Sequence, residues 1–133
     1  MASRPRRTGS SHRVGFNRAR KLAEALPGVE ESTAWGSPSL KVRGNWFAVV
    51  PTNRSAEPNS LAVRVDFPTR DELIAAAPDI YYIKEHYVNY PTVLVRLARI
   101  GDDALEDLLR MAWELAGRAQ KRGRGGPRPA KNV

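Results

Sequence analysis

Short runs of alternating apolar and polar residues, joined by tight turns, constrain the fold of this chain most strongly. Residues 61–67 (LAVRVDF) alternate with a period of two, and residues 92–100 (TVLVRLARI) form a second β-prone run. Such alternation is typical of a strand with one buried face. Gly44-Asn45 stands between two further β-prone runs and predicts a two-residue hairpin turn. Consecutive strands with tight connections favour an antiparallel sheet.

Three helices are predicted around these strands. Apolar residues recur at helical spacing over residues 16–26, and Pro27-Gly28 ends the pattern. Thr69 and Glu72 form a capping box before a short helix that ends at Pro78, and Asp103 with Glu106 caps a final amphipathic helix. The sequence therefore predicts an α+β fold with two layers, in which an antiparallel sheet of about five strands carries helices on one face.

Positive charge is concentrated at the two ends of the chain. The net charge is +8, and residues 1–13 and 120–133 hold nine cations and no acidic residue. Both segments are rich in Gly, Pro, Ser and Arg, a composition that cannot offset the entropy of ordering by burial. We expect a disordered basic arm at 1–13, one folded domain at 14–119 and a second disordered basic arm at 120–133.

Several classes of protein are excluded by composition. The chain has no cysteine, which rules out disulfides, thiolate catalysis and cysteine-ligated metals. No apolar run approaches the roughly 20 residues of a membrane span, and the N-terminus lacks the apolar stretch of a secretory signal. We expect a cytoplasmic protein without a membrane partner, and assume a monomer.

His86 is the main candidate for chemistry, and it lacks partners. No Ser-His-Asp or Cys-His pattern accompanies it, and the other histidine, His12, lies in the N-terminal arm. No spacing typical of metal ligands occurs. We therefore expect no enzyme, no metal and no cofactor. His86, Tyr87 and Tyr90 are expected to pack at the sheet edge with their polar tips hydrogen-bonded, or to contact a ligand.

The charge pattern favours a nucleic-acid partner. If Val42, Val63, Val65, Val93, Val95 and Leu97 face the helices, basic side chains line the uncovered face of the sheet, with Trp46 or Phe47 beside them according to the hairpin register. Cations beside an aromatic ring can hold phosphates and stack bases. The predicted nucleic-acid-binding residues are Lys41, Arg43, Asn45, Arg64, Arg96, Arg4, Arg6, Arg7, Lys121, Arg122 and Arg124.

Several landmarks in order along the chain resemble the MmcQ/YjbR family of small bacterial proteins. They are LPGVEES, GSPSLKVRG, the HY of 86–87, and YPTVLVRL running into DDALEDLLRMAW. The resemblance implies an antiparallel sheet with helices packed against it, related to a double-wing DNA-binding domain. It implies DNA binding and offers no catalytic residues. We expect the basic arms to give affinity and the sheet or hairpin to orient the complex, and because phosphate contacts would dominate, we expect low sequence specificity.

A second interpretation belongs to a different functional class. Trp35, Trp46, His86 and Tyr87 could form an aromatic pocket in a module that binds a small molecule or a protein. A concave apolar cavity around these residues would favour this interpretation, whereas a flat or convex basic sheet would favour nucleic acid.

Overall fold

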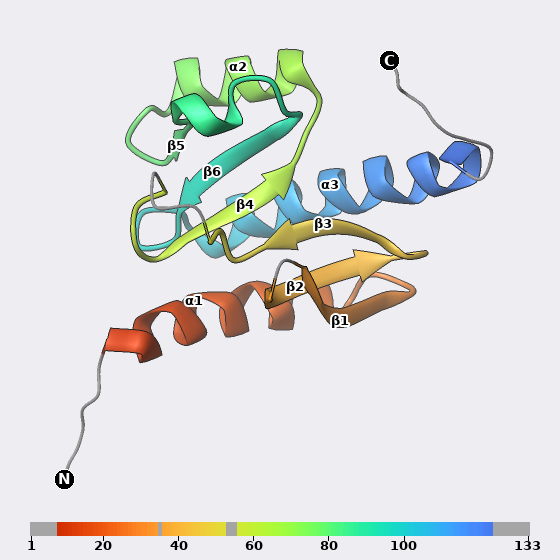
Figure 1. The fold of residues 1–133 in the computed structure, drawn as a ribbon. Coiled ribbons are helices and arrows are strands. Elements are labelled where there is room, and N and C mark those ends of the chain that lie inside the picture. The colour runs from red at the N-terminus through yellow and green to blue at the C-terminus, as the bar shows by residue number, and fades with distance from the viewer. Residues whose placement is uncertain (1–7, 35, 53–55, 124–133) are drawn as a thin grey trace, which may run out of the picture.

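One antiparallel sheet and three α-helices make up the fold. The computed structural model describes residues 8–34, 36–52 and 56–123, with side chains from 15 to 118 within those ranges. The elements are α1 (Thr8–Ala23), β1 (Val29–Ala34), β2 (Ser37–Val42), β3 (Asn45–Val49), β4 (Ser60–Arg64), α2 (Phe67–Ala76), β5 (Tyr81–Tyr82), the 3-10 turn η1 (Glu85–Tyr87), β6 (Thr92–Arg96) and α3 (Asp102–Gly123). The strand order is β1-β2-β3-β4-β6-β5, as Figure 1 shows.

The helices enclose one face of this sheet. α1 and α3 pack together against it, while α2 lies by β5 and β6 (Figure 1). Phe47, Leu61 and Leu105 are fully buried in the core between these layers. The residues predicted to face the helices all belong to this core: Val42, Val63, Val65, Val93, Val95 and Leu97. The predicted α+β fold with an antiparallel sheet is therefore confirmed.

The sheet has six strands where the sequence predicted about five. The additional strand is β5, which consists of Tyr81 and Tyr82 and pairs with Val95 and Leu94 of β6. A two-residue strand is too short to show an alternating pattern. Only the neighbouring strand β6 identifies it.

The hairpin between β2 and β3 turns one residue earlier than predicted. Val42 pairs with Asn45, so the two turn residues are Arg43 and Gly44, with φ angles of 53° and 83°. Positive φ at both central residues is typical of a type I′ turn. The earlier turn places Asn45 on the helix side, where its Nδ2 donates to the carbonyl of Ala116 in α3 at 3.1 Å. The prediction of a Gly44-Asn45 turn is wrong.

A β-bulge in β3 decides which aromatic residue enters the core. Leu40 pairs with Ala48 and Lys41 pairs with Trp46, which leaves Phe47 without a partner in the ladder. Phe47 is completely buried in the helix-side core, whereas Trp46 packs on the opposite face. The bulge thus resolves the two registers that the sequence left open.

The predicted caps of both later helices are displaced. In α2 the N-cap is Asp66, whose Oδ1 accepts a hydrogen bond from the Thr69 backbone N–H at 2.9 Å. Thr69 is therefore inside the first turn rather than at its cap. In α3 the helix begins at Asp102, so Asp102 and Asp103 both lie in the first turn. Their carboxylates are still stabilised by the positive, N-terminal end of the helix dipole.

Helical backbone extends further towards both ends of the chain than predicted. α1 begins at Thr8 and α3 ends at Gly123, so residues 8–13 and 120–123 are helical where we expected disordered arms. Most of the added residues of α3 are good helix formers, and extending an existing helix gains one hydrogen bond per residue. The remainder of both predicted arms lies outside the described residues.

Candidate ligand pocket on the open sheet face

The face of the sheet opposite α1 and α3, here called the open face, has an apolar central row. The strand pairings place five residues side by side across the sheet: Ser39, Val49, Ala62, Leu94 and Tyr82. Four of them form a second buried cluster, against which Trp46 and Tyr87 pack. This row is the floor on which the candidate site is built.

A pocket of about 800 Å³ lies over this floor. Its volume is within the range of small-molecule sites, and its surface is mainly apolar. The floor comes from β3 and β4, one wall from residues 50–52 after β3, and another from the connection between β5 and β6. The lining residues are Trp46, Val49, Val50, Pro51, Thr52, Ala62, Arg64, His86, Tyr87, Tyr90, Pro91 and Thr92.

The wall from residues 86–91 is held in place by Arg70 of α2. This arginine is only 8% exposed, and its Nη1 donates to the carbonyls of Val88 and Tyr90 at 2.9 and 3.3 Å. Its Nε donates to the carboxylate of Asp71 at 3.1 Å. Both carbonyls belong to an irregular segment that has no ladder partners of its own, so the two bonds fix the position of the wall.

Two rings of this wall contact each other at right angles. The His86 and Tyr87 rings lie 4.9 Å apart with an interplanar angle of 85°, an edge-to-face arrangement. Burial raises the pKa of the Tyr87 phenol above its usual value, so Tyr87 is a neutral hydrogen-bond donor at neutral pH. The wall therefore combines aromatic surface with a hydroxyl.

Arg64 is the cation among the described residues that line the pocket. It is the last residue of β4 and is half-buried, and its Nε donates to the Trp46 carbonyl at 3.2 Å. Its guanidinium carbon lies 5.3 Å from the centroid of the Trp46 ring. Burial lowers the pKa of the Arg64 guanidinium, because the charged form loses water.

No carboxylate neutralises this charge within the described residues. All fourteen acidic side chains of the chain lie between residues 24 and 114, inside the described ranges, and none forms an ion pair with Arg64. By contrast, Arg18, Arg70 and Arg96 each pair with a carboxylate. A half-buried charge without a counterion is costly, which makes Arg64 a candidate anion-binding group.

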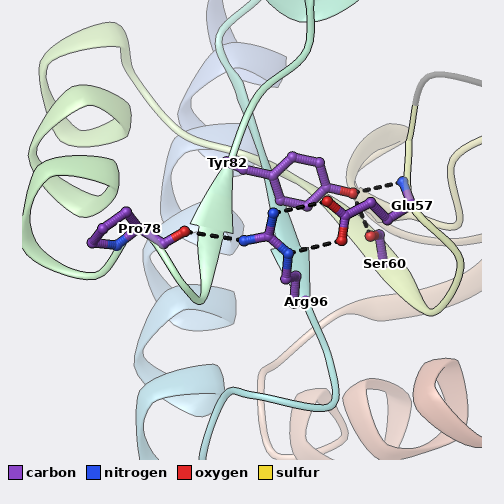
Figure 2. A network of polar contacts seen from close by, with 5 residues as sticks. All are labelled: Glu57, Ser60, Pro78, Tyr82 and Arg96. Atoms are coloured by element: carbon purple, nitrogen blue, oxygen red, sulfur yellow. Dashed lines mark hydrogen bonds and ion pairs between the residues drawn. The ribbon is translucent and has the colours of Figure 1, made fainter.

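Arg96 lies at the opposite end of the same face and is fully engaged. Figure 2 shows its guanidinium bonded to both carboxylate oxygens of Glu57, at 2.8 Å each, and to the carbonyl of Pro78 at 3.0 Å. It stacks on Tyr82 at 4.3 Å, and the Tyr82 hydroxyl accepts from the Glu57 N–H at 2.8 Å and bonds Ser60 Oγ at 2.6 Å. We call these five residues the Glu57–Arg96 network.

The pKa values within the network reflect this pairing. Hydrogen bonding to Arg96 holds the pKa of the Glu57 carboxyl below its usual value, and the same contact raises the pKa of Arg96. Both groups are thus ionised at neutral pH. The network ties residue 57 to β6, close to where the chain enters β4.

The structure disperses the residues that we predicted to bind nucleic acid. Lys41 is on the open face directly opposite Glu30 of β1, and Arg43 is exposed at the hairpin turn. Asn45, which was predicted to lie at the hairpin turn against a nucleic acid, points instead to the helix side, where its amide bonds α3. Arg64 faces the pocket and Arg96 is paired with Glu57. Lys41, Arg64 and Arg96 thus share the open face, but each lies on a different strand and in different surroundings.

The predicted residues nearer the chain ends remain without a described position. Arg4, Arg6, Arg7 and Arg124 lie outside the described residues. Lys121 and Arg122 belong to the helical backbone of α3, and their side chains are outside the described set.

Three of the four predicted pocket residues do come together. Trp46, His86 and Tyr87 all line the cavity, and Trp35 lies outside the described residues. The sequence interpretation missed Arg64 as a pocket residue, because it counted this side chain among the basic ones. Alternation placed Arg64 on the open face, which was the available signal, but it left open whether Trp46 or Phe47 would lie beside it.

A metal-binding cluster and a membrane-spanning helix are both absent from the described ranges. Nowhere within them do three histidine or acidic side chains gather closely enough to hold a metal ion. None of the helices in those ranges combines the length and apolarity needed to cross a membrane.

The fold and sequence are similar to those of known proteins. A crystal structure of Deinococcus radiodurans protein DR2400, with a DUF419 domain, matches with a TM-score of 0.63 at 22% identity, covering 87% of this chain and 91% of that one. The uncharacterized proteins Mb2600 of Mycobacterium bovis and Rv2570 of Mycobacterium tuberculosis are each 42% identical over 66 residues, which cover 47% of this chain. The match spans about half the length of these curated relatives, 51%.

The match to a known family covers both the sheet and the candidate site. Residues 24–115 match the YjbR family. This range contains every strand of the sheet, the pocket lining and the Glu57–Arg96 network. The segments quoted for the resemblance all fall within it. The chain belongs to the YjbR family.

Proposed function

We propose that this chain is a binding protein whose pocket on the open face takes a small molecule with an apolar body and one anionic group. The observation that carries the proposal is Arg64, a half-buried guanidinium beside a mainly apolar cavity with no carboxylate partner among the described residues. A bound anion would supply the missing counterion. The apolar body would cover the floor formed by Val49 and Ala62.

The shape of the open face supports this proposal over nucleic acid. A concave cavity surrounded by Trp46, His86 and Tyr87 matches the expectation for a small-molecule site. The basic side chains are separated from one another, and the guanidinium of Arg96 is already hydrogen-bonded to Glu57 and Pro78. A duplex needs several unpaired cations in a row to gain much from counterion release.

A dye titration tests the proposal. Anilinonaphthalene sulfonate combines aromatic rings with one anion and fluoresces in apolar surroundings. We expect saturable binding at one site, weakened about tenfold or more by Arg64→Met, in line with the loss of a charge-assisted contact. Arg43→Met removes an equal charge from the exposed hairpin turn and serves as the matched control. Equal dye binding by Arg64→Met and wild type would refute the proposal.

Nucleic-acid binding is a second candidate function, favoured by a specific observation at the hairpin. Lys41 and Arg43 lie at or beside an exposed turn, and nine further cations occur in residues 1–13 and 120–133. Full engagement of those nine would give a slope of at most about −8 for log affinity against log salt on duplex DNA. Fluorescence anisotropy of a labelled duplex at two salt concentrations tests it. Here Arg43→Met should weaken binding and Arg64→Met should not.

A further inference from the structure

We infer that the ligand of this pocket is an aromatic monocarboxylate. The inference rests on the proposed function and names the chemical class of its ligand. It is carried by three features: the terminal N–H donors that Arg64 has left, the single lysine or arginine among the described lining residues, and the aromatic residues around it.

The remaining donors of Arg64 suit a carboxylate. Its Nε is used by the Trp46 carbonyl, while its terminal nitrogens make no hydrogen bond within the described residues. Two terminal N–H groups of a guanidinium lie parallel and match the two coplanar oxygens of a carboxylate. The contact with Trp46 also restricts the guanidinium to one orientation, so less freedom is lost when the anion binds.

The charge of the lining suits a monoanion. Among the described lining residues Arg64 is the only lysine or arginine, and the other polar side-chain groups there are hydroxyls, the imidazole of His86 and the indole N–H of Trp46. A phosphate monoester carries about −1.5 to −2 at neutral pH, so one guanidinium would leave part of its charge uncompensated in a mainly apolar site. One carboxylate is balanced by one guanidinium.

The walls suit a flat ring system. Trp46 comes from β3, and Tyr87 and Tyr90 come from the connection between β5 and β6. Ring faces and edges of this kind favour stacked or edge-on aromatic contacts, worth about 0.5–1.5 kcal/mol beyond burial. In the floor, the small side chain of Ala62 lies between Val49 and Leu94 in the central row. A larger residue there would fill the space in which a ring can lie.

Calorimetric titration with three probes of one ring shape tests the inference. Naphthoate carries the carboxylate, naphthamide is neutral with nearly the same shape, and naphthyl phosphate carries the larger charge. We expect naphthoate to bind at least about tenfold more tightly than either of the others, and to lose this advantage in Arg64→Met. A tighter fit of the phosphate, or equal binding of the amide, would overturn the carboxylate assignment.

A filling substitution tests the position of the ring without changing charge. Ala62→Leu should weaken naphthoate binding about tenfold or more, whereas Ala98→Leu, at an exposed site, should leave it unchanged. Ala62→Val is the smaller alternative if the leucine variant fails to fold. Unchanged naphthoate binding in a folded Ala62 variant would contradict a ring lying on this floor.

The two proposals fail in different ways. If the sulfonate dye binds with the expected dependence on Arg64 but naphthoate does not bind, the pocket stands and the carboxylate class is wrong. If neither probe responds to Arg64→Met, both proposals are wrong.

Discussion

Two arginines on the open face of one sheet have opposite surroundings. Arg64 ends β4, and Arg96 of β6 pairs with Ser60, the first residue of β4, so the two mark opposite ends of the same ladder. Arg96 has a bidentate carboxylate, a carbonyl and an aromatic ring as partners. Arg64 has the Trp46 carbonyl and ring, and otherwise faces a cavity. A cation of this sheet is available for a ligand only where the fold has not supplied its counterion.

Removing Arg96 should have the largest effect on stability, because its end of the ladder is the one with partners. Arg96→Met should lower the free energy of unfolding by about 2 kcal/mol, because it removes the pair to Glu57 and the bond to Pro78. The estimate is below that for fully buried pairs, since the side chains of Arg96 and Glu57 are 28% and 39% exposed. Urea denaturation measures the change. Arg99→Met, on an exposed arginine, is the control, and an equal effect in both variants would show that the network does not stabilise the fold.

The tyrosine of the network should have a smaller effect. Tyr82→Phe removes a hydroxyl that accepts from the Glu57 N–H and bonds Ser60 Oγ, and should cost about 1 kcal/mol. The ring, and its stacking with Arg96, remains. Tyr90→Phe, at a residue that is 53% exposed, should cost much less in the same urea experiment. If the two variants lose equal stability, the buried hydroxyl is not a structural partner.

Acid should weaken the Arg96 end of the ladder. Hydrogen bonding to Arg96 lowers the folded-state pKa of Glu57 below its ordinary value of 4.5, so the contribution to stability is complete above that value and is lost as pH falls through the lowered folded pKa. Solvent screening of the partly exposed carboxylate keeps this effect below that of Arg96→Met. Thermal melts from neutral pH downward measure it. Glu57→Gln should flatten this part of the profile, and an unchanged acid slope in that variant would exclude Glu57 as its source.

Removing Arg64 should have the smallest effect on stability. The free energy of unfolding of Arg64→Met should lie within about 0.5 kcal/mol of the wild-type value, or slightly above it. The variant loses the hydrogen bond to the Trp46 carbonyl, but it no longer carries a half-buried charge. The same variant should lose anion binding. Urea denaturation beside Arg96→Met measures the contrast between the two ends. If Arg64→Met lowers the free energy of unfolding as much as Arg96→Met does, then Arg64 stabilises the fold and is not a cation kept for a ligand.

Alternation in the sequence was enough to predict which residues of β4 and β6 lie on the open face. The valines of β4 and β6 face the helices as predicted, so Arg64 and Arg96 lie on the opposite side. Which of the two is available could not be predicted, because Glu57 is 39 residues from Arg96 and no local pattern links them. The family landmarks were recognised directly, and they include His86 and Tyr87 of the pocket wall.

The predictions were wrong or left open where a position depends on a contact with a segment far away in the sequence. Asn45 was expected in a turn because its residue type tolerates one, yet its amide bonds the carbonyl of Ala116 in α3, and the turn moves to Arg43. The bulge at Phe47 likewise depends on how β2 and β3 pair, and it sends Trp46 to the open face. Propensity identifies candidates for such positions but does not choose between them.

The sequence by itself determined the fold class, the family and the faces of the residues in β4 and β6, because these depend on period, turn residues and landmark order. Only the tertiary structure decided that Trp46, Arg64 and Tyr87 surround one cavity and that Arg96 is already paired. The physical reason is that a pocket, like a counterion, is made by segments far apart in the chain. The energy of a charge depends on which of those segments lies next to it.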